Sequence, residues 1–283
     1  MLATAIIVFR EVLEAALIIG IVMAASRGVP RRAAWVAGGI AAGVLGAVAV
    51  AAGAGTIAEA VEGMGQEIFD ATVLFAAVAM LGWHNVWMSR HGREMAAEAN
   101  RLGSEVRTGS RPLWALAVVV GLATLREGSE IVLFLYGIAV AGGGGFAAMA
   151  TGGAVGLALG VGAGTGIYLG LVSIPMKYLF LVTTWLVLLL AAGLASQAAA
   201  FLMQADLLPP LGSNLWDTSF LLTDQSLAGR VLHTLIGYTA QPAGIQLVFY
   251  VTTLLLIGGL MVTIGGARPA RMRRPAGRQA AAP

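Results

Sequence analysis

The chain of 283 residues has no cysteine and very little charge, and each of these absences narrows what it can be. Without cysteine it can form neither a disulfide framework nor a thiolate metal site, so any metal ion must be held by oxygen or nitrogen ligands. Charged residues make up only 11% of the chain and hydrophobic residues 58%. The 39 glycines fit the same class, because glycine is common where membrane helices pack. The composition predicts a polytopic membrane protein.

Sequence signatures of several enzyme classes are missing as well. The chain contains no His-Glu-x-x-His, no Gly-x-Ser-x-Gly and no Gly-rich phosphate-binding motif with its Lys. These patterns mark metalloproteases, serine hydrolases and nucleotide-driven machines. We therefore expect no enzymatic activity and no permanently bound cofactor, and any transport must use a gradient, the membrane potential or a partner.

Seven apolar runs are long enough to cross a bilayer core, which takes about 20 helical residues. They cover residues 2–25, 33–55, 66–88, 112–140, 146–172, 178–203 and 245–265. The first run carries three charges in its middle, so it predicts a retained first helix rather than a cleaved signal. The expected fold is an all-α polytopic membrane protein, with one seven-helix domain over residues 1–268. A basic cytoplasmic tail follows at residues 269–283, and we expect it to be disordered.

Basic residues are distributed unevenly over the loops between these runs. Of the seventeen Lys and Arg, fourteen fall on one set of alternating loops, Arg230 falls on the other set, and two lie inside apolar runs. Because Lys and Arg favour cytoplasmic loops, the N-terminus is predicted outside and the C-terminus in the cytoplasm. The net charge of +3 then reflects membrane orientation and gives no reason to expect nucleic-acid binding.

A charged pattern, Arg-Glu-x-x-Glu, occurs twice inside the apolar runs, at residues 10–14 and 126–130. An isolated charge at the centre of a membrane helix is costly, so such charges persist only with partners and usually with a function. The spacing places all three charged side chains of each copy on one helix face. Four carboxylates that face one another offer oxygen ligands to a hard or borderline cation. The candidate metal ligands are Glu11, Glu14, Glu127 and Glu130, and the supporting charges are Arg10 and Arg126.

The two copies lie 116 positions apart (126 minus 10), on the first and fourth predicted helices. These helices run in opposite directions across the membrane. This arrangement predicts an inverted repeat, in which helices one to three match helices four to six and the seventh helix is added. Such folds hold their substrate at the interface of the repeats near the membrane midplane. We therefore predict one shared site formed by both motifs.

Two other interpretations of the motifs stay open. The motifs can be buried salt bridges that only join two helices, although four acids for two bases exceed what that role needs. Alternatively, the chain can be a proton-coupled transporter of another metal cation or of a small anion. An anion site should leave positive charge in excess, whereas each motif carries two acids and one base.

A second group of acids lies at the predicted outer side. Glu67 and Asp70 share a helix face at the start of the third run, and Glu59 and Glu62 precede them on a loop. Together they can form an acidic funnel that attracts a cation, so Glu67 and Asp70 are added to the candidate metal-binding residues. The two loop acids can equally belong to a solvated surface.

The two Arg-Glu-x-x-Glu motifs, on the first and fourth of seven predicted helices, resemble those of the high-affinity iron permease family. This family contains the oxidase-dependent iron transporters of fungi and bacteria. Residues 66–70, Gln-Glu-Ile-Phe-Asp, are similar to a Gln-Glu-x-x-Glu stretch of bacterial members. The resemblance implies an iron permease of the bacterial cytoplasmic (inner) membrane, whose motifs bind and pass ferrous or ferric iron. It also implies a periplasmic oxidase or iron-donating protein as partner.

Two further predictions concern single features. Residues 221–238 predict an interfacial amphipathic helix with Asp224 near its start. His84 lies between Trp83 and Asn85 near the inner end of the third run. We expect His84 to be an interfacial or packing residue rather than a ligand, with a role at the exit as the alternative.

Overall fold

The computed structural model describes residues 1–61, 65–142, 145–171, 176–212 and 214–265, and in these ranges the chain forms eight helices and no strand. The helices are α1 (Leu2–Ala25), α2 (Arg32–Val61), α3 (Gln66–Arg107), α4 (Trp114–Val140), α5 (Phe146–Tyr168), α6 (Met176–Gln204), α7 (Leu227–Ile236) and α8 (Gly244–Gly265). The expected all-α fold is confirmed. The predicted tail at residues 269–283 lies outside the described residues.

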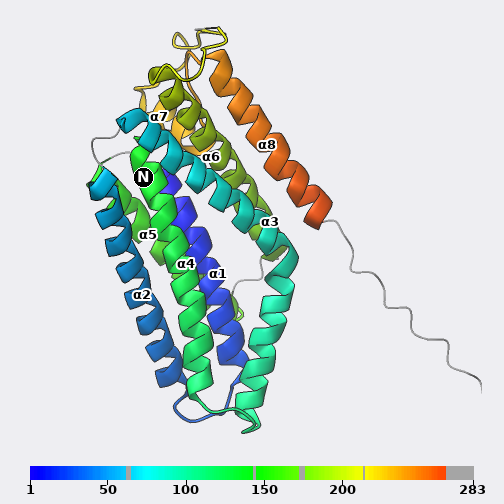
Figure 1. Cartoon of the computed structure of the whole chain (residues 1–283). Coiled ribbons are helices and arrows are strands. Elements are labelled where there is room, and N and C mark those ends of the chain that lie inside the picture. Colours follow the sequence, from blue (N-terminus) through cyan, green and yellow to red (C-terminus); the bar gives the residue numbers. More distant parts are fainter. Residues whose placement is uncertain (62–64, 143–144, 172–175, 213, 266–283) are drawn as a thin grey trace, which may run out of the picture.

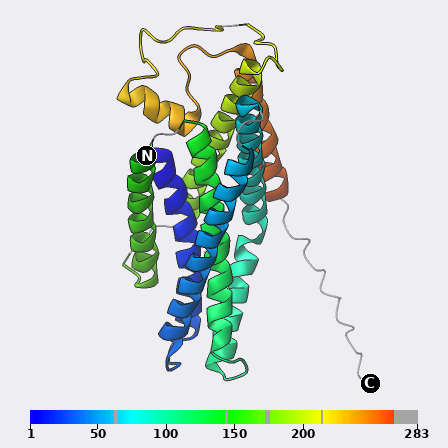
Figure 2. The same ribbon diagram turned by 60° about the vertical axis from the view of Figure 1, so that its left-hand side comes forward.

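The helices form an elongated bundle with α1 and α4 at its centre, running in opposite directions (Figure 1). Helix α2 packs along α4, and α5 packs along α1 (Figure 2). Helix α3 contacts both central helices, while α6 packs on α3 and α8 packs on α6. Between them, α1 and α4 therefore pack against α2, α3, α5 and α6, whereas α8 packs on α3 and α6.

Five helices are long and apolar enough to cross a membrane by length and composition. The segments are Arg32–Gly53, Gln66–Met88, Phe146–Tyr168, Leu181–Gln204 and Gly244–Thr263. Helices α1 and α4 are as long as these, but each carries the three charges of one motif, and this excludes them from a purely compositional count. The multi-pass membrane character expected from the sequence is supported.

Helix α3 continues 19 residues beyond the apolar run 66–88 and ends at Arg107. One face of this extension is apolar, and Ala99, Leu102 and Val106 are buried there against α1 and α4. The opposite face is polar, and Arg101 pairs with Glu98 at 2.8 Å between Nη2 and Oε1. The helix continues past the hydrophobic run because its second half is amphipathic and packs its apolar face against α1 and α4.

Two apolar clusters divide the bundle along α1. One contains Ala3 and Ile7 together with residues of α3, α4 and α6, and the other contains Ile18 and Val22 together with residues of α2, α3 and α4. Residues 10–14 lie between the two clusters. The first motif is therefore enclosed by apolar side chains on both sides along the helix axis.

Close glycine contacts hold two pairs of helices together. The glycines of α5 that are buried against α1 are Gly152, Gly156, Gly160 and Gly164. On α2, Gly39 and Gly43 lie against α4 in the same manner. A Cβ atom at Gly156 would lie 2.5 Å from the carbonyl oxygen of Ala5, so a larger residue would force the backbones apart. The pairs α1/α5 and α2/α4 owe their close approach to these positions.

The two pairs are packed alike in detail. The atoms nearest to a Cβ at Gly156 would be the oxygen of Ala5, the Cβ of Val8 and the nitrogen of Phe9. The atoms nearest to a Cβ at Gly43 would be the oxygen of Gly121, the Cβ of Thr124 and the nitrogen of Leu125. Each of the latter residues follows its counterpart by 116 positions (121 minus 5, 124 minus 8, 125 minus 9), the separation of the two motifs.

The segment between α6 and α8 contains a helix shorter than the predicted 221–238. Helix α7 begins after Ser226, whose hydroxyl accepts a hydrogen bond from the Gly229 N–H at 2.9 Å, and it ends at Gly237 with a φ of 69°. Asp224 does not lie in the helix. Its Oδ1 instead accepts from the Ala240 N–H at 2.9 Å and joins the chain before α7 to the chain after it. The amphipathic helix is present, but a serine cap and a glycine stop limit it to ten residues.

Asp217 joins two parts of the same segment between α6 and α8. Its carboxylate accepts hydrogen bonds from the hydroxyl and the N–H of Ser219 and from the side-chain amide of Gln241, at 2.8 Å for the amide. These donors, with the Ser219 hydroxyl first, hold the pKa of the Asp217 carboxyl below its usual value. The segment is thus ordered by side-chain hydrogen bonds at both Asp217 and Asp224.

The glycine contacts predict a difference between neighbouring positions of α5. Gly156→Ala should lower the melting temperature of the detergent-purified protein by several degrees, since overpacking of this kind costs about 1–3 kcal/mol. Gly153→Ala is the matched control, because a Cβ at Gly153 has nothing within 4 Å. Thermal unfolding followed by intrinsic fluorescence measures both. Equal melting temperatures for the two variants would contradict the proposed role of close helix packing.

Candidate functional site

The first motif is completely buried on α1. The exposed fractions of Arg10, Glu11 and Glu14 are 2%, 0% and 2%. The guanidinium of Arg10 reaches both acids, with Nη1 at 2.9 Å from Oε1 of Glu11 and Nη2 at 3.2 Å from Oε1 of Glu14. This forked arrangement fixes the two carboxylates relative to each other, as the planar guanidinium is suited to do.

The second motif, on α4, has a different environment. The Nε atom of Arg126 lies 3.2 Å from Oε1 of Glu130 and 3.9 Å from Oε1 of Glu127. The arginine side chain is 31% exposed, and its guanidinium lies 4.0 Å from the ring centre of Trp87 on α3. Its Nη1 also donates to the sulfur of Met95 at 3.6 Å. The two copies of one sequence pattern are therefore not equivalent in three dimensions.

His84 lies among the acids of both motifs and was not expected there. The side chain is buried, with 3% of it exposed. Its Nε2 lies 3.6 Å from Oε2 of Glu14 and 3.8 Å from Oε2 of Glu11, and its Nδ1 contacts Oε2 of Glu130. The expectation of a packing or interfacial residue does not describe this position. Its neighbour Trp83 is instead 73% exposed on the outside of the bundle.

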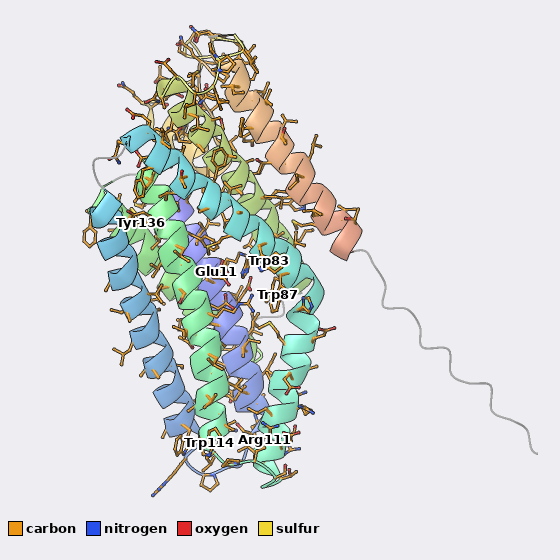
Figure 3. The ribbon with its side chains drawn as sticks, in the orientation of Figure 1. Glu11, Trp83, Trp87, Arg111, Trp114 and Tyr136 are labelled. Atoms are coloured by element: carbon orange, nitrogen blue, oxygen red, sulfur yellow. The ribbon has the colours of Figure 1, made fainter. Side chains whose placement is uncertain are left out.

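A pattern in the sequence could have placed His84 correctly. Helix α3 buries Leu74, Ala77 and Leu81 at spacings of three and four residues. The same spacing leads to position 84, so His84 continues the inner face of the helix. Trp83 lies one position away, is 73% exposed and lies close to the level of Glu11 in Figure 3. The helical spacing of the buried residues thus indicates that His84 faces the bundle interior, whereas the neighbouring Trp83 suggested an interfacial position.

Four side chains bring one ligand atom each into a small volume. Among the described residues, the ligand atoms of Glu11, His84, Glu127 and Glu130 lie within 4.8 Å of one another. Metal–ligand bonds of about 2.0–2.6 Å place opposite ligands about 4–5 Å apart, so the group has the size of a single-ion site. Oε2 of Glu11 and Oε2 of Glu127 are buried and have no hydrogen-bond partner. Such atoms are costly unless a ligand or a proton satisfies them.

Glu14 lies at the edge of this group. It pairs with Arg10 and lies 3.6 Å from His84, but it does not belong to the set of four ligand atoms. The structure thus brings three of the four predicted motif acids into one group and places the fourth beside it. The predicted meeting of the two motifs across the bundle centre agrees with this geometry.

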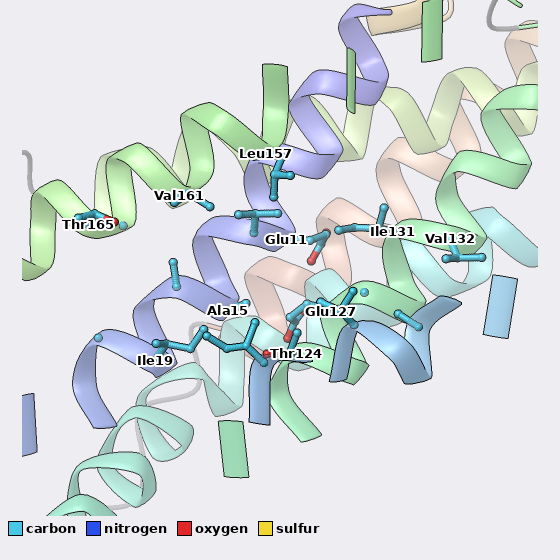
Figure 4. A pocket seen from close by; sticks show the side chains of 18 of the residues that line it. Glu11, Ala15, Ile19, Thr124, Glu127, Ile131, Val132, Leu157, Val161 and Thr165 are labelled. Carbon is cyan, nitrogen blue, oxygen red and sulfur yellow. The ribbon is translucent and has the colours of Figure 1, made fainter. Parts of the chain in front are cut away.

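A cavity of about 670 Å³ adjoins the acids on the side of α2 and α5. It lies between the pairs α1/α5 and α2/α4, and Glu11, Thr124 and Glu127 line its wall (Figure 4). Apart from the hydroxyl groups of Thr165 and Tyr168, the rest of the lining is apolar. The two carboxylates are therefore reached from this side only across apolar surface.

The outer acids predicted as metal-binding residues are distant from the group. Glu67 and Asp70 lie in the first turn of α3, and the fourteen residues from Asp70 to His84 span about 21 Å of helix. Gln66 donates its amide N–H to Oδ1 of Asp70 at 3.0 Å. Glu62 lies outside the described residues, and the side chain of Glu59 is likewise not described. Glu67 and Asp70 can act only at a separate position, at the end of the bundle where α3 begins.

The unequal environments of the two arginines predict unequal effects of removing them. Arg10→Met should sharply reduce the amount of folded protein, because an uncompensated buried charge costs about 3–5 kcal/mol. Arg126→Met should be tolerated better, since 31% of this side chain is exposed and its charge is less enclosed by the protein. Size-exclusion chromatography of detergent-solubilised protein measures the folded fraction, with Arg101→Met on the polar face of α3 as control. An equal loss of folded protein in the Arg10→Met and Arg126→Met variants would show that the difference in burial has no effect on stability.

Comparison with known proteins places these features in a family. The chain matches the family model named iron permease FTR1 family over residues 1–269. It is 29% identical over 243 residues to the ferrous iron permease EfeU of Escherichia coli O6:H1, and 30% identical over 243 residues to the EfeU proteins of Shigella sonnei and Escherichia coli O157:H7. Each comparison covers 84% of this chain and 87% of the relative. No solved structure gives a significant match. Since the family match includes both motifs and every described helix, the chain belongs to the iron permease FTR1 family.

Proposed function

We propose that this permease moves iron across the bacterial cytoplasmic membrane into the cell through a carboxylate site formed by its two motifs. The observation that carries the proposal is the meeting of Glu11 from the first motif with Glu127 and Glu130 from the second, within 4.8 Å. Oxygen ligands from two separate helices are what a transported cation can bridge and later release.

The charge of the site favours a cation. Four carboxylates face two arginines, so the ionised group has an excess of two negative charges that an iron ion can neutralise. Buried charges without a partner are strongly destabilising, and this gives the ion a favourable interaction that water cannot supply.

The two competing interpretations account for fewer of the contacts. An anion site needs a free guanidinium, but Arg10 is completely buried and already paired with Glu11 and Glu14. A purely structural set of salt bridges should leave no buried acceptor unsatisfied. Oε2 of Glu11 and Oε2 of Glu127 have no hydrogen-bond partner, which fits a ligand site better than a structural device.

We also propose that α1 and α4 span the membrane, which gives seven spans, and that α1–α3 and α4–α6 form an inverted repeat. The equivalent packing at Gly43 and Gly156 supports the repeat, because its residues are separated by the same 116 positions as the motifs. With the positive loops inside, the N-terminus lies outside and the tail after residue 268 in the cytoplasm. The repeat axis would then pass near the acids, between the two central helices.

Glu67 and Asp70 would serve at the outer entrance rather than at the central site. They lie in the first turn of α3, at the end of the bundle where α1 begins (Figure 1). An acidic entrance raises the local concentration of cations. A periplasmic oxidase or iron-donating protein, which the family resemblance implies, would deliver iron at this end.

The proposal predicts that each acid of the cluster is needed for uptake. Glu11→Gln, Glu14→Gln, Glu127→Gln and Glu130→Gln should each lower iron uptake into proteoliposomes about tenfold or more, since disturbing even an outer-shell partner costs roughly 10–100-fold in metal affinity. Glu98→Gln, exposed on the polar half of α3, is the matched control. Native uptake by folded Glu11→Gln and Glu130→Gln variants would refute the shared site.

The entrance acids should change the concentration dependence of uptake instead of its maximum rate. The double variant Glu67→Gln, Asp70→Asn should raise the apparent KM for iron severalfold with little change in the limiting rate, because attraction to an entrance affects encounter rather than transfer. The rise should shrink at high ionic strength, where exposed charges are screened. A reduced limiting rate with an unchanged KM would place these residues in the transfer step.

A further inference from the structure

We propose that His84 is a nitrogen ligand of the transported ion and that it makes the site selective for divalent transition-metal ions over Ca²⁺ and Mg²⁺. This inference rests on the proposed function, because it assigns a role to a further residue of the same site. It concerns a residue that lies outside both motifs and on a different helix.

The position of His84 is that of a ligand. The imidazole lies between the two motifs, with Nε2 directed at Glu11 and Glu14 on α1 and Nδ1 directed at Glu130 on α4. One of its nitrogens belongs to the group of four ligand atoms that lie within 4.8 Å of one another. No other side chain in this group comes from α3, so His84 connects α3 to both central helices at the site.

The second ring nitrogen has the partner that a metal-binding histidine requires. A histidine that ligates a metal almost always donates its other N–H to a carboxylate, a carbonyl or water, which fixes the ring and its tautomer. Acids lie on both sides of the His84 ring. When Nε2 binds the ion, Oε2 of Glu130 is in place to accept the proton on Nδ1.

Packing alone does not account for a histidine at this position. The preceding buried residues on this face of α3, Ala77 and Leu81, are aliphatic. An aliphatic residue at position 84 would fill the same face without burying a polar group. A buried imidazole beside four acids is 97% inaccessible and carries two polar nitrogens. The aromatic stack nearest to it on this helix is between Trp87 and His91, and Trp87 also covers Arg126. The ion-pair contacts of His84 are with Glu11, Glu14 and Glu130.

A nitrogen ligand changes which ions the site prefers. Carboxylates alone suit Ca²⁺, Mg²⁺ and Mn²⁺, whereas imidazole suits iron, zinc, copper and nickel. Ca²⁺ and Mg²⁺ are abundant, and a site made only of four acids would bind them as well. In the proposed repeat, α6 is the counterpart of α3, and α6 contains no histidine. The site therefore has one nitrogen ligand from α3 and no equivalent ligand from α6. One imidazole is therefore the element that discriminates between the two classes of ion.

Electron spin echo spectroscopy of bound Mn²⁺ tests the ligand directly. The chain has three histidines, His84, His91 and His233. Purified native protein loaded with Mn²⁺ should show the nuclear modulation of a directly bound imidazole nitrogen, and His84→Gln should abolish it. His91→Gln and His233→Gln are matched controls and should retain it. Native protein grown with ¹⁵N-histidine should show the ¹⁵N frequency, which needs no substitution and therefore holds even if His84→Gln fails to fold.

The outcomes separate this inference from the proposed function. If Glu11→Gln removes the bound Mn²⁺ but the native signal contains no histidine nitrogen, the carboxylate site stands and the role of His84 is wrong. If the nitrogen signal persists in folded His84→Gln, the inference is equally wrong. If native protein binds no Mn²⁺, Zn²⁺ or Fe²⁺, the proposed function itself fails.

Competition during transport tests the selectivity. Zn²⁺ binds nitrogen-containing sites more tightly than Fe²⁺ does, so it should inhibit iron uptake by the native protein far more strongly than Ca²⁺ or Mg²⁺. His84→Gln replaces the nitrogen by an oxygen ligand of similar reach. The variant should lose about tenfold or more of the Zn²⁺ inhibition, on the scale that metal ligand shells show, and should gain inhibition by Ca²⁺. An unchanged order of inhibitors would overturn the selectivity claim.

Discussion

The structure depends on one constraint, which is that six charged side chains of two motifs must be neutralised away from water. Each charge would be costly on an isolated membrane helix, so α1 and α4 cannot be independent of each other or of α3. Arg10 satisfies part of this requirement within its own helix by pairing with Glu11 and Glu14. The remainder is satisfied between helices, where Glu11, Glu127, Glu130 and His84 converge. The position of the site is thus a consequence of where these charges can be tolerated.

Close helix packing makes that convergence possible. Glycines of α5 and α2 allow their backbones to approach α1 and α4, and the contacts at Gly156 and Gly43 are built alike. Each central helix therefore packs against a glycine-containing partner on one face, α1 against α5 and α4 against α2. The charged faces of α1 and α4 are directed toward each other. Apolar clusters on both sides of residues 10–14 then keep water from the acids. In this environment a bound cation interacts with carboxylates far more strongly than it would in water.

The two motifs share a sequence pattern but not the details that matter for chemistry. Arg10 is enclosed and forked between two acids, whereas Arg126 is partly exposed and stacked over Trp87. His84 comes from α3 alone, because α6 has no histidine. A symmetric pair of motifs therefore forms an asymmetric site, with a rigid side at α1 and a more accessible side at α4.

Several features of this protein follow from the sequence alone. Composition and run length predict an all-helical membrane protein, since about 20 apolar residues have few other stable states in a bilayer. The two Arg-Glu-x-x-Glu patterns identify the central acids, because charges in an apolar run are rare enough to be informative on their own. The spacing of 116 positions indicates the repeat, and the stripe of glycines indicates a close helix contact. All of these are properties of local pattern and of the solvent that surrounds the chain.

The tertiary structure decided what depends on the relative rotation of neighbouring helices. It brought His84 to the acids and excluded Glu14 from the four ligand atoms. It placed Asp70 about 21 Å of helix away from His84, with Glu67 farther still. It also made Arg10 and Arg126 unequal, although their sequence motifs are the same. A residue one position along a helix turns by about 100°, since there are 3.6 residues in a turn. Which of Trp83 and His84 faces the acids is therefore set by the packing of α3 against α1, α4 and α6, and no local pattern contains that information unambiguously.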